Sequence, residues 1–159
     1  MDEYRFIADA MLGRLAKWLR VMGYDTLYFS LIDDPELIKI ARQEQRIILT
    51  KDTLLAKSQK ADPVLLIHSN YAGEQLKEVL IFLRNKTPFL PELSPRCVSC
   101  NGQLITIGKE SAMNNVPDYI FLQQKTFLLC SDCGKIFWHG SHKKRMDEMV
   151  RNVLRELKI

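Results

Sequence analysis

Several features are missing from this sequence, and each absence excludes a class of protein. No stretch contains the roughly 18 consecutive apolar residues that a membrane-spanning helix needs. The first residues, MDEYRFIADAML, are acidic and lack the basic start and apolar core of a signal peptide. Internal repeats and low-complexity tracts are also absent. We therefore expect a globular cytoplasmic protein that does not bind a membrane.

A strong charge of either sign is missing as well. The chain of 159 residues has 23 Lys and Arg against 19 Asp and Glu, a formal net charge of +4. Such a mild bias does not by itself indicate a nucleic-acid partner. The basic excess lies mostly after residue 96 and is concentrated in HKKRMDEMVRNVLREL (142–157). This segment predicts a helix whose charges form either a solvated face or a phosphate-binding surface.

The first 86 residues alternate short apolar runs with helical patterns. Asp34 before Pro35 is suited to cap the second helix, and Gly23 is suited to end the first. This alternation predicts an α/β fold with a parallel sheet flanked by helices on both faces. Strands are predicted at 4–9, 25–30, 46–50 and 63–69, and helices at 11–23, 33–45, 54–59 and 72–85.

A proline-rich segment separates this region from the rest of the chain. Residues 87–96, TPFLPELSPR, contain three prolines, which prevent the preceding helix from continuing. We therefore expect a first domain at 1–86, a stiff linker at 87–96 and a second domain at 97–159. The last helix is expected to begin near Ser141, as its N-cap.

All four cysteines follow the linker, in two C-x-x-C pairs. Cys97 and Cys100 form the first pair, and Cys130 and Cys133 form the second. Gly134 follows the second pair and would help it form a tight turn. Two such pairs can complete a tetrahedral zinc site. Disulfides would need an oxidising compartment, and a redox pair would open a helix of a βαβ unit, which neither pair does. Four cysteine ligands leave no open position, so the zinc is expected to be structural.

Acidic residues follow the predicted strands of the first domain. Asp9 ends the first strand and Asp52 follows the third, while Asp33 and Asp34 begin the helix between the second and third. Open parallel sheets bind ligands at the carboxyl ends of their strands, where these carboxylates would converge. Clustered carboxylates repel one another unless a hard cation such as Mg²⁺ or Mn²⁺ neutralises them. The simpler interpretation is that Asp34 and Asp52 cap the helices after them, which leaves Asp9 the hardest to explain without a metal.

Several longer motifs resemble a known family. The segments FIADAMLGRLAKWLRVMGYDT and DDPELIKIARQEQRIILTKD are similar to the Mut-seven C-terminal RNase family, in which a PIN-like domain is fused to a zinc ribbon. The ribbon of that family resembles CVSCNGQL and CSDCGKIFWHGSHKKRM in this chain. Together these motifs cover essentially the whole chain, so the resemblance implies a PIN-like α/β domain followed by a Cys₄ ribbon and a C-terminal helix.

The same resemblance implies a metal-dependent ribonuclease whose Mg²⁺ or Mn²⁺ is bound by the catalytic acids Asp9, Asp34 and Asp52. By this resemblance Asp33 can substitute for Asp34, and Thr50 orients the site. PIN nucleases commonly have a fourth acid shortly after the third, and this chain has none directly after Asp52. We therefore expect one metal to bind firmly and a second to bind only with substrate.

Basic and aromatic residues are candidates for RNA contacts, although ordinary surface charge and core packing explain them as well. Trp138 either packs the ribbon against the first domain or stacks on an unpaired base. Single-stranded RNA is the expected substrate, since duplex RNA hides its base edges. A non-catalytic adaptor for RNA or the ribosome, and a ribbon that docks a protein partner, are the competing functions. The candidate RNA-binding residues are Arg14, Lys17, Lys51, His142, Lys143 and Arg145.

Overall fold

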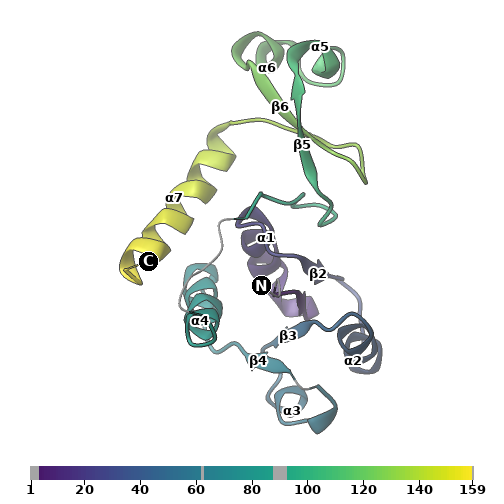
Figure 1. The fold of residues 1–159 in the computed structure, drawn as a ribbon, viewed down its shortest axis with the longest axis vertical. Coiled ribbons are helices and arrows are strands. Elements are labelled where there is room, and N and C mark those ends of the chain that lie inside the picture. The colour runs from purple at the N-terminus through teal and green to yellow at the C-terminus, as the bar shows by residue number, and fades with distance from the viewer. Residues whose placement is uncertain (1–3, 62, 88–92, 159) are drawn as a thin grey trace.

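The computed structural model describes residues 4–61, 63–87 and 93–158, which form two lobes with a long helix running from one to the other (Figure 1). The N-terminal lobe contains a four-stranded parallel sheet, and the other lobe, here called the ribbon, contains a three-stranded antiparallel sheet. None of the helices in the described ranges is long and apolar enough to span a membrane. The predicted α/β architecture, with a C-terminal helix after the cysteines, is confirmed.

The parallel sheet has the strand order β2-β1-β3-β4, which places β1 and β3 at its centre. Both central strands are fully buried, which explains why their sequences are continuous apolar runs. In register, Phe6 lies between Thr26 of β2 and Ile47 of β3. The strands are β1 (Phe6–Ala8), β2 (Thr26–Tyr28), β3 (Ile47–Thr50) and β4 (Val64–Leu66).

Helices cover both faces of this sheet, as alternating side chains require. Phe6 and Leu49 point into one core, where they pack with leucines of α1 and α4. Ile7 and Ile48 point the opposite way, into a smaller core with α2 and α3. The helices of this lobe are α1 (Gly13–Val21), α2 (Asp34–Gln43), α3 (Thr53–Ala56) and α4 (Ala72–Arg84), with the 3₁₀ turns η1 (Ala10–Leu12) and η2 (Gln59–Ala61).

The ribbon contains two short helices that its sequence did not predict. They fill the long gap between the two cysteine pairs and pack with Phe127 and half-buried Trp138 in a small core of their own. Trp138 therefore packs within the ribbon, in addition to lying near the last helix. The elements are β5 (Leu104–Gly108), α5 (Lys109–Ala112), α6 (Asp118–Gln123), β6 (Thr126–Cys130) and β7 (Ile136–Phe137).

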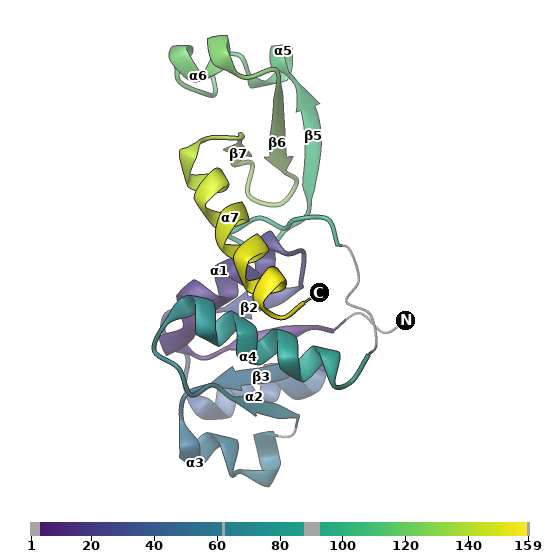
Figure 2. The same cartoon turned by 90° about the vertical axis from the view of Figure 1, so that its left-hand side faces the viewer.

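The last helix, α7 (Ser141–Glu156), leaves the ribbon and packs against α1 and α4 of the N-terminal lobe (Figure 2). Val153 is buried, and Met149, Leu154 and Leu157 pack around it in the same core as Phe6. The predicted second domain, 97–159, therefore contacts the N-terminal lobe through α7. Residues 88–92 of the expected linker lie outside the described ranges.

Candidate functional site

Asp9 lies directly after β1, where three hydrogen bonds hold its carboxylate. Its Oδ1 accepts from the backbone N–H of Met11 at 2.9 Å. Its Oδ2 accepts from the Thr50 hydroxyl at 2.5 Å and from the Lys51 N–H at 2.9 Å. Because β1 and β3 are neighbours, these bonds fix the carboxylate of the first strand to the end of the third. Asp9 is only 9% exposed, so it is a buried acid. It lies on the side of the sheet where the parallel strands end, here called the carboxyl edge; the side where they begin is called the amino edge.

Thr50 connects Asp9 to Asp52. The hydroxyl that donates to Asp9 also accepts the backbone N–H of Asp52 at 2.9 Å. Asp52 is exposed, and its Oδ1 accepts from the N–H groups of Leu54 and Leu55 at 2.7 and 3.1 Å, so it caps α3. Its Oδ2 accepts no hydrogen bond from the part of the chain that the structure describes. The expected cap is therefore present, and the other carboxylate oxygen of this exposed residue is available to a ligand.

The third predicted acid lies at the start of α2, after the edge strand β2. The N-cap is Asp33, whose Oδ1 accepts the Glu36 N–H at 2.9 Å, and Asp34 is the first helical residue. The prediction that Asp34 caps this helix was therefore wrong by one residue. Asp34 is exposed and lines a shallow depression with Lys39 and Lys60. Within the described ranges, no three acidic side chains gather as closely as the four cysteines do.

The predicted RNA-binding residues fall on two separate surfaces. Arg14 and Lys17 are exposed on α1, five and eight residues after Asp9. The Lys51 ammonium donates to the side chain of Asn70. Lys143 and Arg145 lie at the other surface, on the first turns of α7 beside the ribbon. Lys143 is paired with Asp147 at 2.8 Å and Arg145 is exposed, while the side chain of His142 lies outside the described part of the chain. α7 begins after Gly140, which is its N-cap in place of the predicted Ser141.

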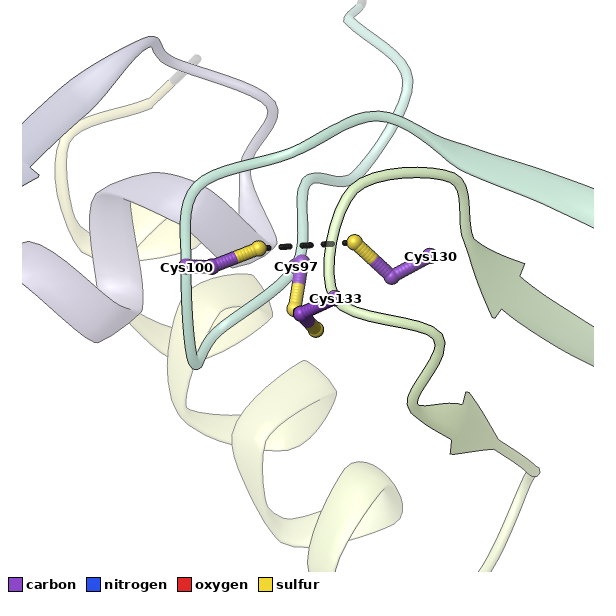
Figure 3. A group of neighbouring side chains, drawn as sticks. All are labelled: Cys97, Cys100, Cys130 and Cys133. Carbon is purple, nitrogen blue, oxygen red and sulfur yellow. Dashed lines mark hydrogen bonds between the residues drawn. The ribbon is translucent and has the colours of Figure 1, made fainter.

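The four cysteines gather at the junction of the two lobes (Figure 3). Their sulfur atoms all lie within 4.8 Å of one another. The Cys100 and Cys130 sulfurs are 3.4 Å apart, and those of Cys97 and Cys133 are 3.7 Å apart. A tetrahedral zinc ion with bonds of about 2.3 Å separates its sulfur ligands by about 3.8 Å. The cysteines therefore fit a metal such as zinc, as the spacing predicted.

Backbone N–H groups in the second cysteine turn point at the first sulfur of that turn. Burial raises the pKa of the Cys130 thiol, but hydrogen bonds from the N–H groups of Cys133 and Asp132, together with those to the Cys100 and Cys133 thiols, outweigh it and lower the pKa to about 7. Burial, together with the neighbouring thiols, raises the pKa of Cys100 to about 12. The cluster therefore needs a bound cation to hold all its sulfurs as thiolates. Gly134 has φ +71°, a conformation that glycine adopts without strain, so it suits this turn as expected.

The first cysteine turn is attached to the N-terminal lobe through Asn101, a residue that the sequence reasoning did not select. The Asn101 Oδ1 accepts the buried N–H of Thr26 at 2.9 Å, and its Nδ2 donates to Asp25 at 2.7 Å. Asp25 also accepts from Arg46 at 2.7 Å. Burial raises the pKa of Asp25, but the hydrogen bonds from Arg46 and Asn101 outweigh it and lower the pKa.

This attachment lies at the amino end of β2, so the cysteines and the acids occupy opposite edges of the parallel sheet. Asn101 has φ +73°, a conformation that Asn tolerates better than most residues. An Asn immediately after a C-x-x-C pair was therefore the available signal for this contact. Arg20 strengthens the same junction, donating to the carbonyls of Thr26 and Val98, each at 2.9 Å.

The fold and the cysteine cluster define an α/β protein with a four-cysteine ribbon attached to the amino edge of its parallel sheet. The family model of the Mut7-C RNAse domain matches residues 4–150, and the chain belongs to this family. The predicted family is thereby confirmed, and its name indicates a nuclease-like role. No curated protein and no solved structure matches the chain.

Proposed function

We propose that this protein is a metal-dependent ribonuclease that hydrolyses phosphodiester bonds of single-stranded RNA. The observation that supports this most directly is the hydrogen-bonded series Asp9–Thr50–Asp52 at the carboxyl edge, in a chain that matches an RNase family. The carboxyl edge of a parallel sheet is where such folds bind their ligands. Asp9, Asp34 and Asp52 are the proposed catalytic acids, with Asp33 as the substitute for Asp34.

The donor chemistry suits Mg²⁺ or Mn²⁺, which prefer oxygen ligands and often bind through one or two carboxylates plus substrate phosphate. Bound there, the metal would supply Lewis acidity and an activated water. In this proposal Thr50 positions Asp9, because its hydroxyl reaches Asp9 while holding the backbone of Asp52. The open oxygen of Asp52 faces the substrate, and Lys51 and Arg14 bind phosphates beside the site.

The cysteine cluster has a structural role in this proposal. Zn²⁺ bound by Cys97, Cys100, Cys130 and Cys133 would leave no open coordination position for substrate. Its place at the opposite edge of the sheet from Asp9 also separates it from the proposed chemistry. Elemental analysis of the purified protein should find about one zinc ion per chain.

One observation favours a second function, a non-catalytic adaptor for RNA or the ribosome. Both oxygens of Asp9 and one oxygen of Asp52 already accept hydrogen bonds from the chain itself. Capping and strand-to-strand bonding would explain these acids without any metal. The adaptor would bind RNA in a salt-sensitive way and leave it intact.

The test is incubation of labelled single-stranded RNA with the purified protein and Mn²⁺ or Mg²⁺. Asp52→Asn and Asp34→Asn change exposed acids, so both variants should fold and should lose metal-dependent cleavage. Asp118→Asn, an exposed acid on α6 of the ribbon, is the matched control and should cleave normally. Cleavage that persists in both acid variants would refute the site, and RNA that is bound but intact would establish the adaptor.

A further inference from the structure

A groove of about 710 Å³ lies where the ribbon, the start of α7 and the end of α1 meet. Its volume is in the range of sites that bind small ligands or parts of larger ones. Its walls are largely apolar, with Val21 from α1, Leu128 from β6 and Met146 from α7. None of the predicted catalytic acids lines it, so it is a separate site from the carboxyl edge.

The charged residues that line this groove are all basic. They are Arg96, Lys143 and Lys144, and no Asp or Glu of the described residues lines it. Arg96 donates to the carbonyls of Gly23 and Asn101, and Lys143 is paired with Asp147, so both are already engaged. Lys144 is exposed and forms no ion pair with any described acid. The groove therefore has an available cation for an anionic group.

Aromatic side chains line the groove beside these cations. Tyr119, on the first turn of α6, is 63% exposed, although a tyrosine normally buries its ring. Phe137, the last residue of β7, also lines the groove, as do Trp138 and His139 in the segment between β7 and α7. Aromatic side chains that line a groove together with an exposed lysine suit a nucleotide, whose base stacks on aromatic rings while its phosphate pairs with Lys or Arg.

We propose that this groove binds an unpaired nucleotide of the RNA substrate, with the base against Tyr119 and the adjacent phosphate at Lys144. Gly140 and Ser141, at the start of α7, also line the groove, and the N-terminal end of a helix favours a negatively charged group. This inference rests on the proposed function and extends it, because the groove and the acids lie at opposite ends of α1. That helix is about 13 Å long, at about 1.5 Å for each of its nine residues. A substrate must therefore reach from one edge of the sheet to the other.

The experiment measures the affinity of the full-length chain for a labelled unstructured oligouridylate, without added Mg²⁺ or Mn²⁺ so that cleavage does not interfere. Tyr119→Ala should weaken binding at least about fivefold, the lower limit for one base stacked on an aromatic ring. Lys144→Glu should weaken binding about tenfold. It should also make the plot of log K against log salt concentration less steep, by about the slope that one phosphate contact contributes. Both residues are exposed, so the variants should fold.

Matched controls separate the groove from its surroundings. Leu122→Ala changes an exposed residue of the same helix α6 outside the groove, and Arg151→Glu reverses a charge on α7 outside the groove. Both should bind within about twofold of the wild type. Unchanged binding by Tyr119→Ala and Lys144→Glu would refute the groove, as would equal weakening by Arg151→Glu. Uridine monophosphate that binds as tightly as the oligouridylate would also overturn the inference, in favour of a small-molecule site.

The groove and the proposed nuclease can fail separately. RNA that is cleaved in an acid-dependent way, but bound equally by the groove variants, would refute the groove alone. RNA that is bound through Tyr119 and Lys144 but never cleaved would refute the nuclease alone.

Discussion

The contact between the first cysteine turn and the N-terminal lobe gives the sharpest prediction of this structure, Asn101→Gly. Glycine accepts the positive φ of 73° at this position, so the substitution removes the side chain without straining the backbone. What is lost is the acceptor for the Thr26 N–H and the donor to Asp25. Thr26 is fully buried and Asn101 is 7% exposed, so water does not readily replace the acceptor of the Thr26 N–H.

The expected cost follows from these two contacts. A buried N–H left without its acceptor costs about 1–3 kcal/mol, and a hydrogen bond to a charged group contributes about 1.5–3 kcal/mol. Arg46 continues to donate to Asp25 at 2.7 Å, so the carboxylate is not left unpaired. We therefore expect Asn101→Gly to lower the free energy of unfolding by about 3–5 kcal/mol.

The assay uses the two tryptophans, which report on different lobes. Trp18 packs on the core of the N-terminal lobe and Trp138 lies in the ribbon. In a Trp138→Phe background, urea unfolding followed by Trp18 fluorescence should show the loss, although Asn101 lies beside the cysteines. Asn114→Gly is the matched control, since Asn114 also has positive φ but is exposed, and it should change stability by less than about 0.5 kcal/mol. A Trp18 transition that does not move in Asn101→Gly would show that the N-terminal lobe does not depend on the cysteine turn.

Two further predictions concern the same lobe. Val153 of α7 is 3% exposed in the core of the N-terminal lobe. Val153→Ala should therefore lower the free energy of unfolding by about 1–3 kcal/mol in the same Trp18 assay. An unchanged free energy of unfolding would mean that α7 is not part of this core. Burial raises the pKa of Asp25, but hydrogen bonds from Arg46 and Asn101 lower it overall, so ionised Asp25 stabilises the fold. This contribution is complete above the unfolded pKa of about 3.9 and is lost as the pH falls through the lower folded pKa. The stability difference between the wild type and Asp25→Asn, about 2–3 kcal/mol at neutral pH, should therefore shrink below about pH 4, and a difference that stays constant to about pH 2 would contradict this reasoning.

Local patterns in the sequence were sufficient for the parallel sheet and the cysteine cluster. The apolar runs at β1 and β3 are buried on both faces, and this makes them recognisable without knowledge of their neighbours. The two C-x-x-C pairs define a metal site through spacing alone. In contrast, α5 and α6 have four and six residues, too few for a periodic apolar pattern.

Long-range packing accounts for the features that the sequence did not reveal. The apolar face of α7 is visible in its sequence, but whether it covers the ribbon or the N-terminal lobe depends on tertiary contacts with α1 and α4. The bonds of Asn101 to residues 25 and 26 span about half of the chain and have no local signature. At α2, either Asp33 or Asp34 could cap the helix. Sequence patterns locate the end of a helix only to within one or two residues, so they do not distinguish between these two acids.

The acids at the carboxyl edge raise the question whether capping and catalysis are competing explanations. A helix cap uses one carboxylate oxygen, as Asp52 shows with its Oδ1 on two N–H groups of α3. The second oxygen is then held in a fixed direction without being used, which is the preorganisation that a catalytic ligand needs. Asp9 differs, since both of its oxygens accept hydrogen bonds, and one of these comes from a threonine hydroxyl that can rotate away. Metal binding would therefore act first on the Thr50–Asp9 bond. Thr50→Val removes both the donor to Asp9 and the acceptor of the Asp52 N–H, whereas Thr50→Ser keeps both. We therefore expect Thr50→Val to reduce cleavage and Thr50→Ser to retain it, and a Thr50→Val protein that cleaves like the wild type would show that the proposed site does not depend on this hydrogen-bonded series.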